Sequence, residues 1–135
     1  MLFSAPSVER PSSWFRWHAS LIQAGARVLD LACGAGRHAI AAAELGGRVT
    51  AVDADAGRLR AARKVAQHRR LSVDWVEADL EHYPVPRLAF DVVLIFNYLD
   101  RRRMRDFAEA VTLGGHFIME TFLESQRQLG WGPKS

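Results

Sequence analysis

The chain has 135 residues, of which 49% are hydrophobic and 24% charged, a balance typical of a single globular domain. Its longest apolar run, residues 90–96, is far shorter than the ~20 residues of a membrane span, and the N-terminus lacks the pattern of a secretory signal. The single cysteine cannot form a disulfide within the chain, so the composition argues against a disulfide-rich secreted protein and favours a cytoplasmic one.

The charge distribution is basic and uneven. The formal net charge is +3 with an isoelectric point near 9.6, and the excess lies in arginine runs at residues 58–70 and 101–105. Such runs could contact nucleic acid. No aromatic side chains interleave with them as in single-strand binding platforms, so solvated helix faces are the better interpretation and nucleic acid is a disfavoured partner.

The N-terminal region is expected to be a loose arm over residues 1–11, followed by one helix. The arm carries two prolines and no periodicity. Ser12 or Ser13 can cap a helix that runs to Ile22. The helix is expected to bury the large side chains that recur at helical spacing, which are Trp14, Trp17 or His18, and Leu21.

Residues 27–31 form a short apolar run that predicts a buried parallel strand, with Asp30 near its end. Gly34 and Gly36 then allow a sharp turn and close approach of a ligand to the backbone, and residues 37–45 predict an alanine-rich helix. The free amides at the start of that helix would face the same crevice. Asp30 is expensive to bury unless a cation or hydrogen-bond donors meet it, which favours a cationic ligand.

A second strand is predicted over residues 48–52, ending in Asp53. Asp55 is expected to cap the helix that follows. The apolar positions of this helix give a buried stripe of Leu59, Ala62 and Ala66.

Three further strands are predicted at residues 71–76, 90–96 and 116–122. Asp100 is expected to cap a helix, and the glycine pair at 114–115 is expected to separate that helix from the last strand. The predicted buried face of the helix comprises Met104, Phe107, Ala108 and Val111.

Strands that alternate with helices predict an α/β fold with a doubly wound, mostly parallel sheet. The ligand should lie outside the carboxyl ends of the strands, between the first and the fourth. The sequence Gly34-x-Gly36-x-x-Ala39 also satisfies the dinucleotide fingerprint, and Asp53 follows near the expected spacing. An NAD-dependent oxidoreductase therefore remains an alternative. The side chains expected to converge on the crevice are Asp30, Asp53, Asp79, Phe96 and Asn97.

An ordered set of motifs resembles the class I S-adenosylmethionine-dependent methyltransferases, which have a Rossmann-like fold. The motifs are V-L-D-L-A-C-G-A-G at 28–36, A-V-D at 51–53, E-A-D-L at 77–80, F-D-V-V-L at 90–94 and G-G-H-F-I-M-E-T-F at 114–122. The resemblance implies methyl transfer from S-adenosylmethionine. The segment F-N-Y-L at 96–99 is not the D/N-P-P-Y/F of enzymes that methylate the amino groups of bases, so a small-molecule acceptor is favoured.

The resemblance also implies a division of the cofactor among the motifs. Asp30 and the backbone around Ala32 and Gly34 would face the methionine part, Asp53 would accept both ribose hydroxyls, and Asp79 with Leu80 would hold the adenine. Asn97 and Tyr98 would face the acceptor, and no catalytic residue or metal ligand is assigned. The implied cofactor-binding set is Asp30, Ala32, Cys33, Gly34, Gly36, Asp53, Ala54, Asp79, Leu80 and Phe96.

The sequence departs from the family pattern in two places. Ala32 replaces the first glycine of many members, and residues 123–135 are too few and too polar for the two strands of the family's C-terminal hairpin. We therefore expect a cofactor-binding domain over residues 12–122 with a short tail. An exposed edge on the fifth strand would favour a homodimer or aggregation. Without the hairpin we expect little methyltransferase activity, so a non-catalytic cofactor-binding fragment is a further alternative.

Overall fold

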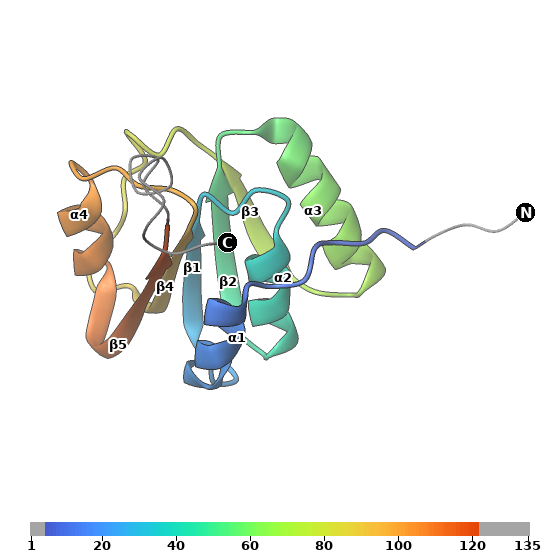
Figure 1. The fold of residues 1–135 in the computed structure, drawn as a ribbon, viewed down its shortest axis with the longest axis horizontal. Coiled ribbons are helices and arrows are strands. Elements are labelled where there is room, and N and C mark those ends of the chain that lie inside the picture. Colours follow the sequence, from blue (N-terminus) through green and yellow to red (C-terminus); the bar gives the residue numbers. More distant parts are fainter. Residues whose placement is uncertain (1–4, 122–135) are drawn as a thin grey trace, which may run out of the picture.

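The structure is a computed structural model that describes residues 5–121. Strands and helices alternate along these residues, except that the loop at 78–89 joins β3 directly to β4 (Figure 1). The elements are α1 (Ser13–His18), the 3-10 helix η1 (Ala19–Leu21), β1 (Arg27–Leu31), α2 (Arg37–Glu44), β2 (Arg48–Asp53), α3 (Ala56–His68), β3 (Val73–Glu77), β4 (Phe90–Phe96), α4 (Met104–Glu109) and β5 (Val111–Glu120).

The five strands form one parallel sheet in the order β3-β2-β1-β4-β5. The chain builds the sheet outward from β1, first through β2 to β3 and then, after crossing back, through β4 to β5. This confirms the predicted doubly wound sheet. The strand order reverses between β1 and β4, which is where such sheets bind ligands.

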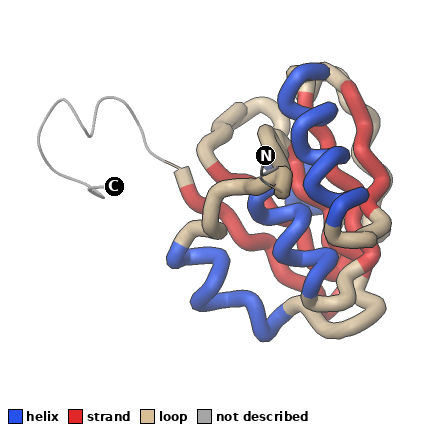
Figure 2. Tube along the Cα trace, turned by 90° about the vertical axis from the view of Figure 1, so that its right-hand side faces the viewer, coloured by secondary structure: helices blue, strands red, loops and turns tan. Residues whose placement is uncertain are grey.

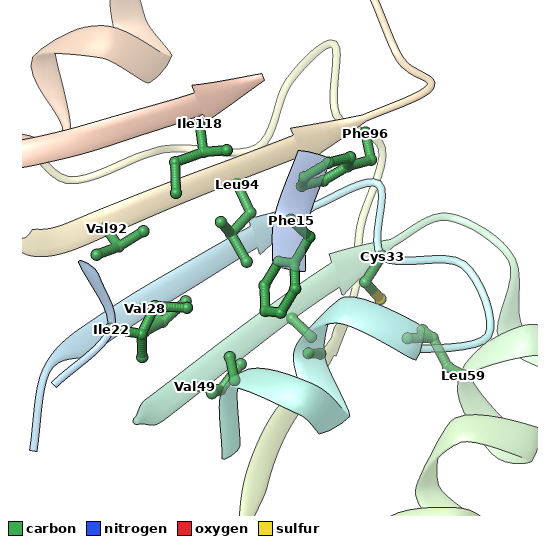
Figure 3. Close-up of a cluster of buried hydrophobic side chains, with 13 residues drawn as sticks. Phe15, Ile22, Val28, Cys33, Val49, Leu59, Val92, Leu94, Phe96 and Ile118 are labelled. Atoms are coloured by element: carbon green, nitrogen blue, oxygen red, sulfur yellow. The ribbon is translucent and has the colours of Figure 1, made fainter. Parts of the chain in front are cut away.

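Side chains alternate between two hydrophobic clusters, one on each face of the sheet. The first cluster includes Val28 and Leu94 and packs against residues of α1, α2 and α3; Figure 3 shows its labelled side chains. The second includes Leu29 and Leu31 together with Phe107 from α4. Figure 2 shows the helices around the strands from the side. Both faces of β1 are therefore covered, which explains its continuous apolar run.

The N-terminal helix begins as predicted but buries a different side chain. Ser12 caps α1 by accepting a hydrogen bond from the Phe15 N–H at 3.1 Å. Phe15 is the buried residue, at 2% exposure, whereas Trp14 is 43% and Trp17 81% exposed. The prediction is wrong for the two tryptophans, because Phe15 packs against the rings of His38 and Phe96 in their place. Leu21 packs against the first cluster, as predicted.

The start of the last helix and one residue of its predicted buried face also differ from the predictions. Asp100 does not cap α4: its carboxylate accepts the Arg102 N–H, and α4 begins after Arg103. Phe107 is buried as predicted, whereas Ala108 is exposed. The later start of the helix follows from the turn at residues 101–103 that precedes it.

The glycine pair at 114–115 lies inside β5, not between a helix and a strand. The pairing of β4 with β5 shifts register between Phe90 and Val92. A Cβ at Gly115 would lie 2.6 Å from the Asp91 carbonyl oxygen, so only glycine lets the two strands approach at this irregularity. β3 likewise begins at Val73, because the Leu71 N–H closes the end of α3 on the Ala66 carbonyl.

Within residues 5–121, no helix combines the length and apolar character that a membrane span requires. Strand β5 lies at one end of the described sheet and pairs there only with β4. Phe122 and the predicted tail at 123–135 lie outside the described residues. The predicted boundaries of the arm, domain and tail remain predictions.

Candidate functional site

The loop after β1 turns sharply through several left-handed residues. Ala32, Gly34 and Gly36 have φ values of +61°, +57° and +88°. The Cys33 N–H donates to the Val52 carbonyl at 3.0 Å, which joins this loop to the end of β2. Such values are costly for a residue with a Cβ, so Ala32 adopts a conformation that the surrounding hydrogen bonds must hold.

Asp53 connects the end of β2 to the glycine loop. Its Oδ2 accepts a hydrogen bond from the Gly34 N–H at 2.8 Å, and its Oδ1 accepts one from the Asp55 N–H at 2.8 Å. Two backbone donors therefore fix the carboxylate in one orientation. Each oxygen keeps a further lone pair for a ligand, because a carboxylate has about four acceptor sites.

A cavity of about 380 Å³ opens beside this carboxylate, above the ends of β1, β2 and β4. Its volume lies in the range of ~300–1,000 Å³ typical of small-ligand sites. Six predicted site residues line it: Ala32, Cys33, Gly34, Asp53, Phe96 and Asn97. The structure thus gathers the ends of three separate strands around one space, as the sequence predicts.

Asp30 does not line the cavity but lies below it, at 1% exposure. Burial, with the nearby Asp53 carboxylate as a second cause, raises the pKa of Asp30 to about 8. Its Oδ2 has no hydrogen-bond partner in the part of the chain that the structure describes. The same burial raises the pKa of the Cys33 thiol, so Cys33 offers a neutral, apolar wall.

The two glycines of the loop have different neighbours. A Cβ at Gly34 would lie 3.1 Å from Nη1 of Arg58, at the cavity. A Cβ at Gly36 would lie 2.8 Å from the Ala62 Cβ and 3.0 Å from the Trp75 ring. Gly36 therefore allows α2 to pack on α3 and β3. It does not line the cavity, so its predicted close approach to a ligand is not observed.

The other predicted residues lie outside this cavity. Ala54 is exposed, Leu80 is buried in the second cluster, and Tyr98 lines a separate cavity with Asp100. Asp79 is exposed, and its carboxylate accepts the Glu81 N–H, which is the first cause of its lowered pKa.

Asp79 also belongs to a small acidic cluster with Glu81 and His82. One ligand atom from each side chain lies within 4.8 Å of the others, so the three could approach a metal ion together. All three are exposed, and His82 already pairs with Asp79 at 3.0 Å. This geometry by itself assigns no metal.

Arg103, which lies 23 residues beyond Leu80 in the sequence, binds the loop that carries Leu80. The guanidinium donates to the carbonyls of Leu80, Glu81 and Tyr83 at 3.1, 2.8 and 2.6 Å, and it lies over the Phe107 ring. Sequence reasoning placed Arg103 in a solvated arginine run. Only the fold brings its side chain, which is 13% exposed, against these carbonyls.

Sequence reasoning also missed several residues that line the cavity beside Asp53: Val8, Glu9, Arg37, His38 and Arg58. Arg37 and His38 directly follow the glycine loop, which is the signal that could have found them. His38 is packed in the core, at 4% exposure and with its ring stacked 3.9 Å from Phe96. Burial, with Arg37 as a second cause, lowers its pKa to about 3, so the ring is neutral and its Nε2 accepts the Ser12 N–H.

Comparison with known proteins identifies the fold family. The profile of the family described as "Methyltransferase domain" matches residues 28–114. The chain belongs to this family. The match favours the methyltransferase interpretation over the oxidoreductase alternative. The matched residues include the glycine loop, Asp53 and β4.

Individual relatives agree with this assignment. The chain is 38% identical to a ubiquinone biosynthesis O-methyltransferase of Methylocella silvestris over 56% of its own length and 30% of that protein. It is 26% identical to an S-adenosylmethionine-dependent methyltransferase of Mesorhizobium loti, with a TM-score of 0.69 and 82% and 54% of the two chains covered. It is 27% identical to the YcgJ protein of Bacillus subtilis, with a TM-score of 0.65 and 76% and 50% covered. The chain thus spans less than a third of that curated relative and about half of these solved structures.

Proposed function

We propose that this domain binds S-adenosylmethionine in the cavity beside Asp53 and transfers its methyl group to a small-molecule acceptor. One observation carries the proposal. The Asp53 carboxylate lies on the wall of a cavity of ligand size, at the edge of the sheet where the strand order reverses, and the Gly34 and Asp55 amides fix its orientation. Membership of the methyltransferase domain family supports it.

The residues of the cavity suit a nucleoside that carries an amino acid. Asp53 keeps lone pairs that can accept two ribose hydroxyls, and the missing Cβ of Gly34 leaves room for close approach. Phe96 and Cys33 offer apolar surface to the carbon atoms around the sulfur of the ligand. Asp79 and Leu80 are proposed for the adenine, at the loop held by Arg103.

When bound, S-adenosylmethionine supplies an electrophilic methyl group on a sulfonium. The protein then has to orient the acceptor in line with that bond and to exclude water. Phe96 and the neutral His38 form an apolar wall for this purpose. No general base is needed where the acceptor is already an anion, because its negative charge and the positive charge of the sulfonium cancel in the displacement.

Asn97 and Tyr98 follow β4 and are proposed to meet the acceptor. Asn97 lines the cavity and has a φ of +60°, a strained conformation of the kind that clusters at functional sites. A small-molecule acceptor is supported by the O-methyltransferase relative, whose name places it in ubiquinone biosynthesis. Nucleic acid is the disfavoured alternative.

A homodimer through the edge of β5 is proposed as the assembly. The supporting feature is that β5, residues 111–120, contains no lysine or proline to deter pairing at the end of the described sheet. Light scattering at several protein concentrations tests it. The single, buried cysteine supports the proposed cytoplasmic location.

Calorimetric titration with S-adenosylhomocysteine and with NAD tests the proposed cofactor. We expect S-adenosylhomocysteine to bind and NAD not to bind. Binding of NAD alone would instead support an oxidoreductase. A methyl-transfer assay with phenolic acceptors then distinguishes an active domain from one that only binds cofactor.

A further inference from the structure

Two opposite charges lie together on the wall of the cavity beside Asp53. Arg37 is the first residue of α2, and Glu9 belongs to the N-terminal segment that crosses α2 on its way to α1 (Figure 1). Arg37 Nη1 lies 3.7 Å from Glu9 Oε2. Both side chains line the cavity, so a bound ligand would meet a cation and an anion at the same place.

The N-terminal segment is fixed to α2 at neighbouring points. Arg37 Nη1 donates to the Arg10 carbonyl at 3.4 Å, and the Ser12 N–H donates to His38 Nε2 at 3.1 Å. The His38 ring is itself held by its stack on Phe96. Glu9 is therefore carried on a segment with defined attachments at the cavity, although it lies far from the glycine loop in the sequence.

The pair lies away from the end of the cavity that is proposed for the ribose. Asp53 ends β2, whereas Phe96, against which His38 stacks, ends β4, and β1 lies between these two strands. A ligand with its ribose at Asp53 would cross the end of β1 and reach the side where Arg37 and Glu9 lie. The end of the ligand that follows the ribose and sulfur is an amino acid.

The contacts of both charges are weak enough to be exchanged. A separation of 3.7 Å exceeds the ~2.7–2.9 Å of a good charge-assisted hydrogen bond. The Arg37 guanidinium has five donors, and its contacts within residues 5–121 use one of its nitrogens. An ion pair this exposed contributes little to stability, so opening it costs little.

We propose that Arg37 and Glu9 together bind the zwitterionic amino acid group of the ligand. Arg37 takes the carboxylate and Glu9 takes the ammonium, and the ligand's charges replace the loose Arg37–Glu9 pair. This inference rests on the proposed function and names the residues that distinguish the whole cofactor from a bare nucleoside.

The test measures the affinities of three nucleosides by calorimetry with the full chain. S-adenosylhomocysteine has both charges, its decarboxylated analogue S-adenosyl-3-thiopropylamine keeps only the amine, and 5′-methylthioadenosine has neither. We expect Arg37→Met and Glu9→Gln each to weaken S-adenosylhomocysteine binding by about tenfold, the size of one hydrogen bond to a charged group. For the decarboxylated analogue we expect that loss only with Glu9→Gln.

Methylthioadenosine affinity is the internal control for folding, and it should change by less than about twofold. Arg58→Met is the matched control, because Arg58 is the other arginine of the cavity and lies against Gly34 on the nucleoside side. It should cause no loss specific to the amino acid group.

Unchanged S-adenosylhomocysteine affinity in the Arg37 and Glu9 variants, or equal losses for all three nucleosides, would overturn the inference while leaving the proposed function intact. A selective loss with Arg58→Met in place of Arg37→Met would also overturn it. Failure of the unaltered protein to bind any of the three would overturn the proposed function, and this inference with it.

Discussion

Replacing Asp53 by alanine should weaken S-adenosylhomocysteine binding while the protein stays folded. The substitution removes the acceptor for two ribose hydroxyls, and hydrogen bonds to a charged group contribute about 1.5–3 kcal/mol each. Because water partly replaces them in the variant, we expect a loss of about 2–3 kcal/mol, or about 30- to 140-fold in Kd.

The same carboxylate accepts the Gly34 and Asp55 amides at 2.8 Å each, so some stability is lost as well. Hydrogen bonds to a charged group contribute about 1.5–3 kcal/mol each, and water replaces part of both in the variant, so we expect a loss of about 2–3 kcal/mol in the free energy of unfolding. Urea denaturation measures this part, and calorimetry on the folded variant measures the binding part.

Asp55→Ala provides the control for Asp53→Ala. Asp55 caps α3 by accepting the Arg58 N–H at 3.1 Å, and it is exposed outside the cavity. Loss of a cap costs about 1 kcal/mol of stability but should leave ligand affinity unchanged. If both variants lost affinity equally, or if Asp53→Ala bound S-adenosylhomocysteine normally, the assignment of Asp53 to the ribose would be wrong.

The remaining predictions concern packing and burial. Gly36→Ala should destabilise the protein by about 2–4 kcal/mol in urea denaturation, because it combines a φ of +88° with a contact of 2.8 Å to Ala62. Gly25→Ala, with a φ of +84° and no atom within 4 Å, should cost only the backbone part, about 1–2 kcal/mol, and equal losses would refute the packing role. Asp30→Asn should change how stability depends on pH. Because the pKa of folded Asp30 is raised to about 8, its carboxyl keeps a proton that the unfolded chain releases above about pH 4. The unaltered protein therefore loses stability as pH rises from about 4 to 8. The variant should lack that decline, and parallel stability curves would contradict it. Phe107→Ala, at a side chain with 0% exposure, should lower the urea midpoint through a loss of about 3–5 kcal/mol, while a variant that unfolds at the same midpoint would show that α4 is not packed as described.

The strands of the sheet could be read from the sequence because their signal is local. The predicted bounds of β1 and β4 agree with the structure, since each is a mostly apolar run whose side chains pack into the clusters on both faces of the sheet. Asp53 and Gly34 could be placed at the same crevice from the sequence for a related reason. Once the strands are parallel and adjacent, their carboxyl ends meet at one edge.

Tertiary contacts decided what local patterns could not. Phe15, not Trp14 or Trp17, faces the core because the rings of His38 and Phe96 lie opposite it. A single helical turn offers several faces, and only the partner selects one.

The residues around the cavity likewise divide into those that the sequence predicts and those that only the fold brings there. The sequence determined the glycine loop, the acid at the end of β2 and the apolar end of β4, because these follow directly from strand ends. It did not determine that Glu9 would lie beside Arg37, or that Arg103 would bind the carbonyls of the loop after β3. Those contacts join segments far apart in the chain, and their formation depends on how the sheet places α2 and α4, which no local spacing encodes.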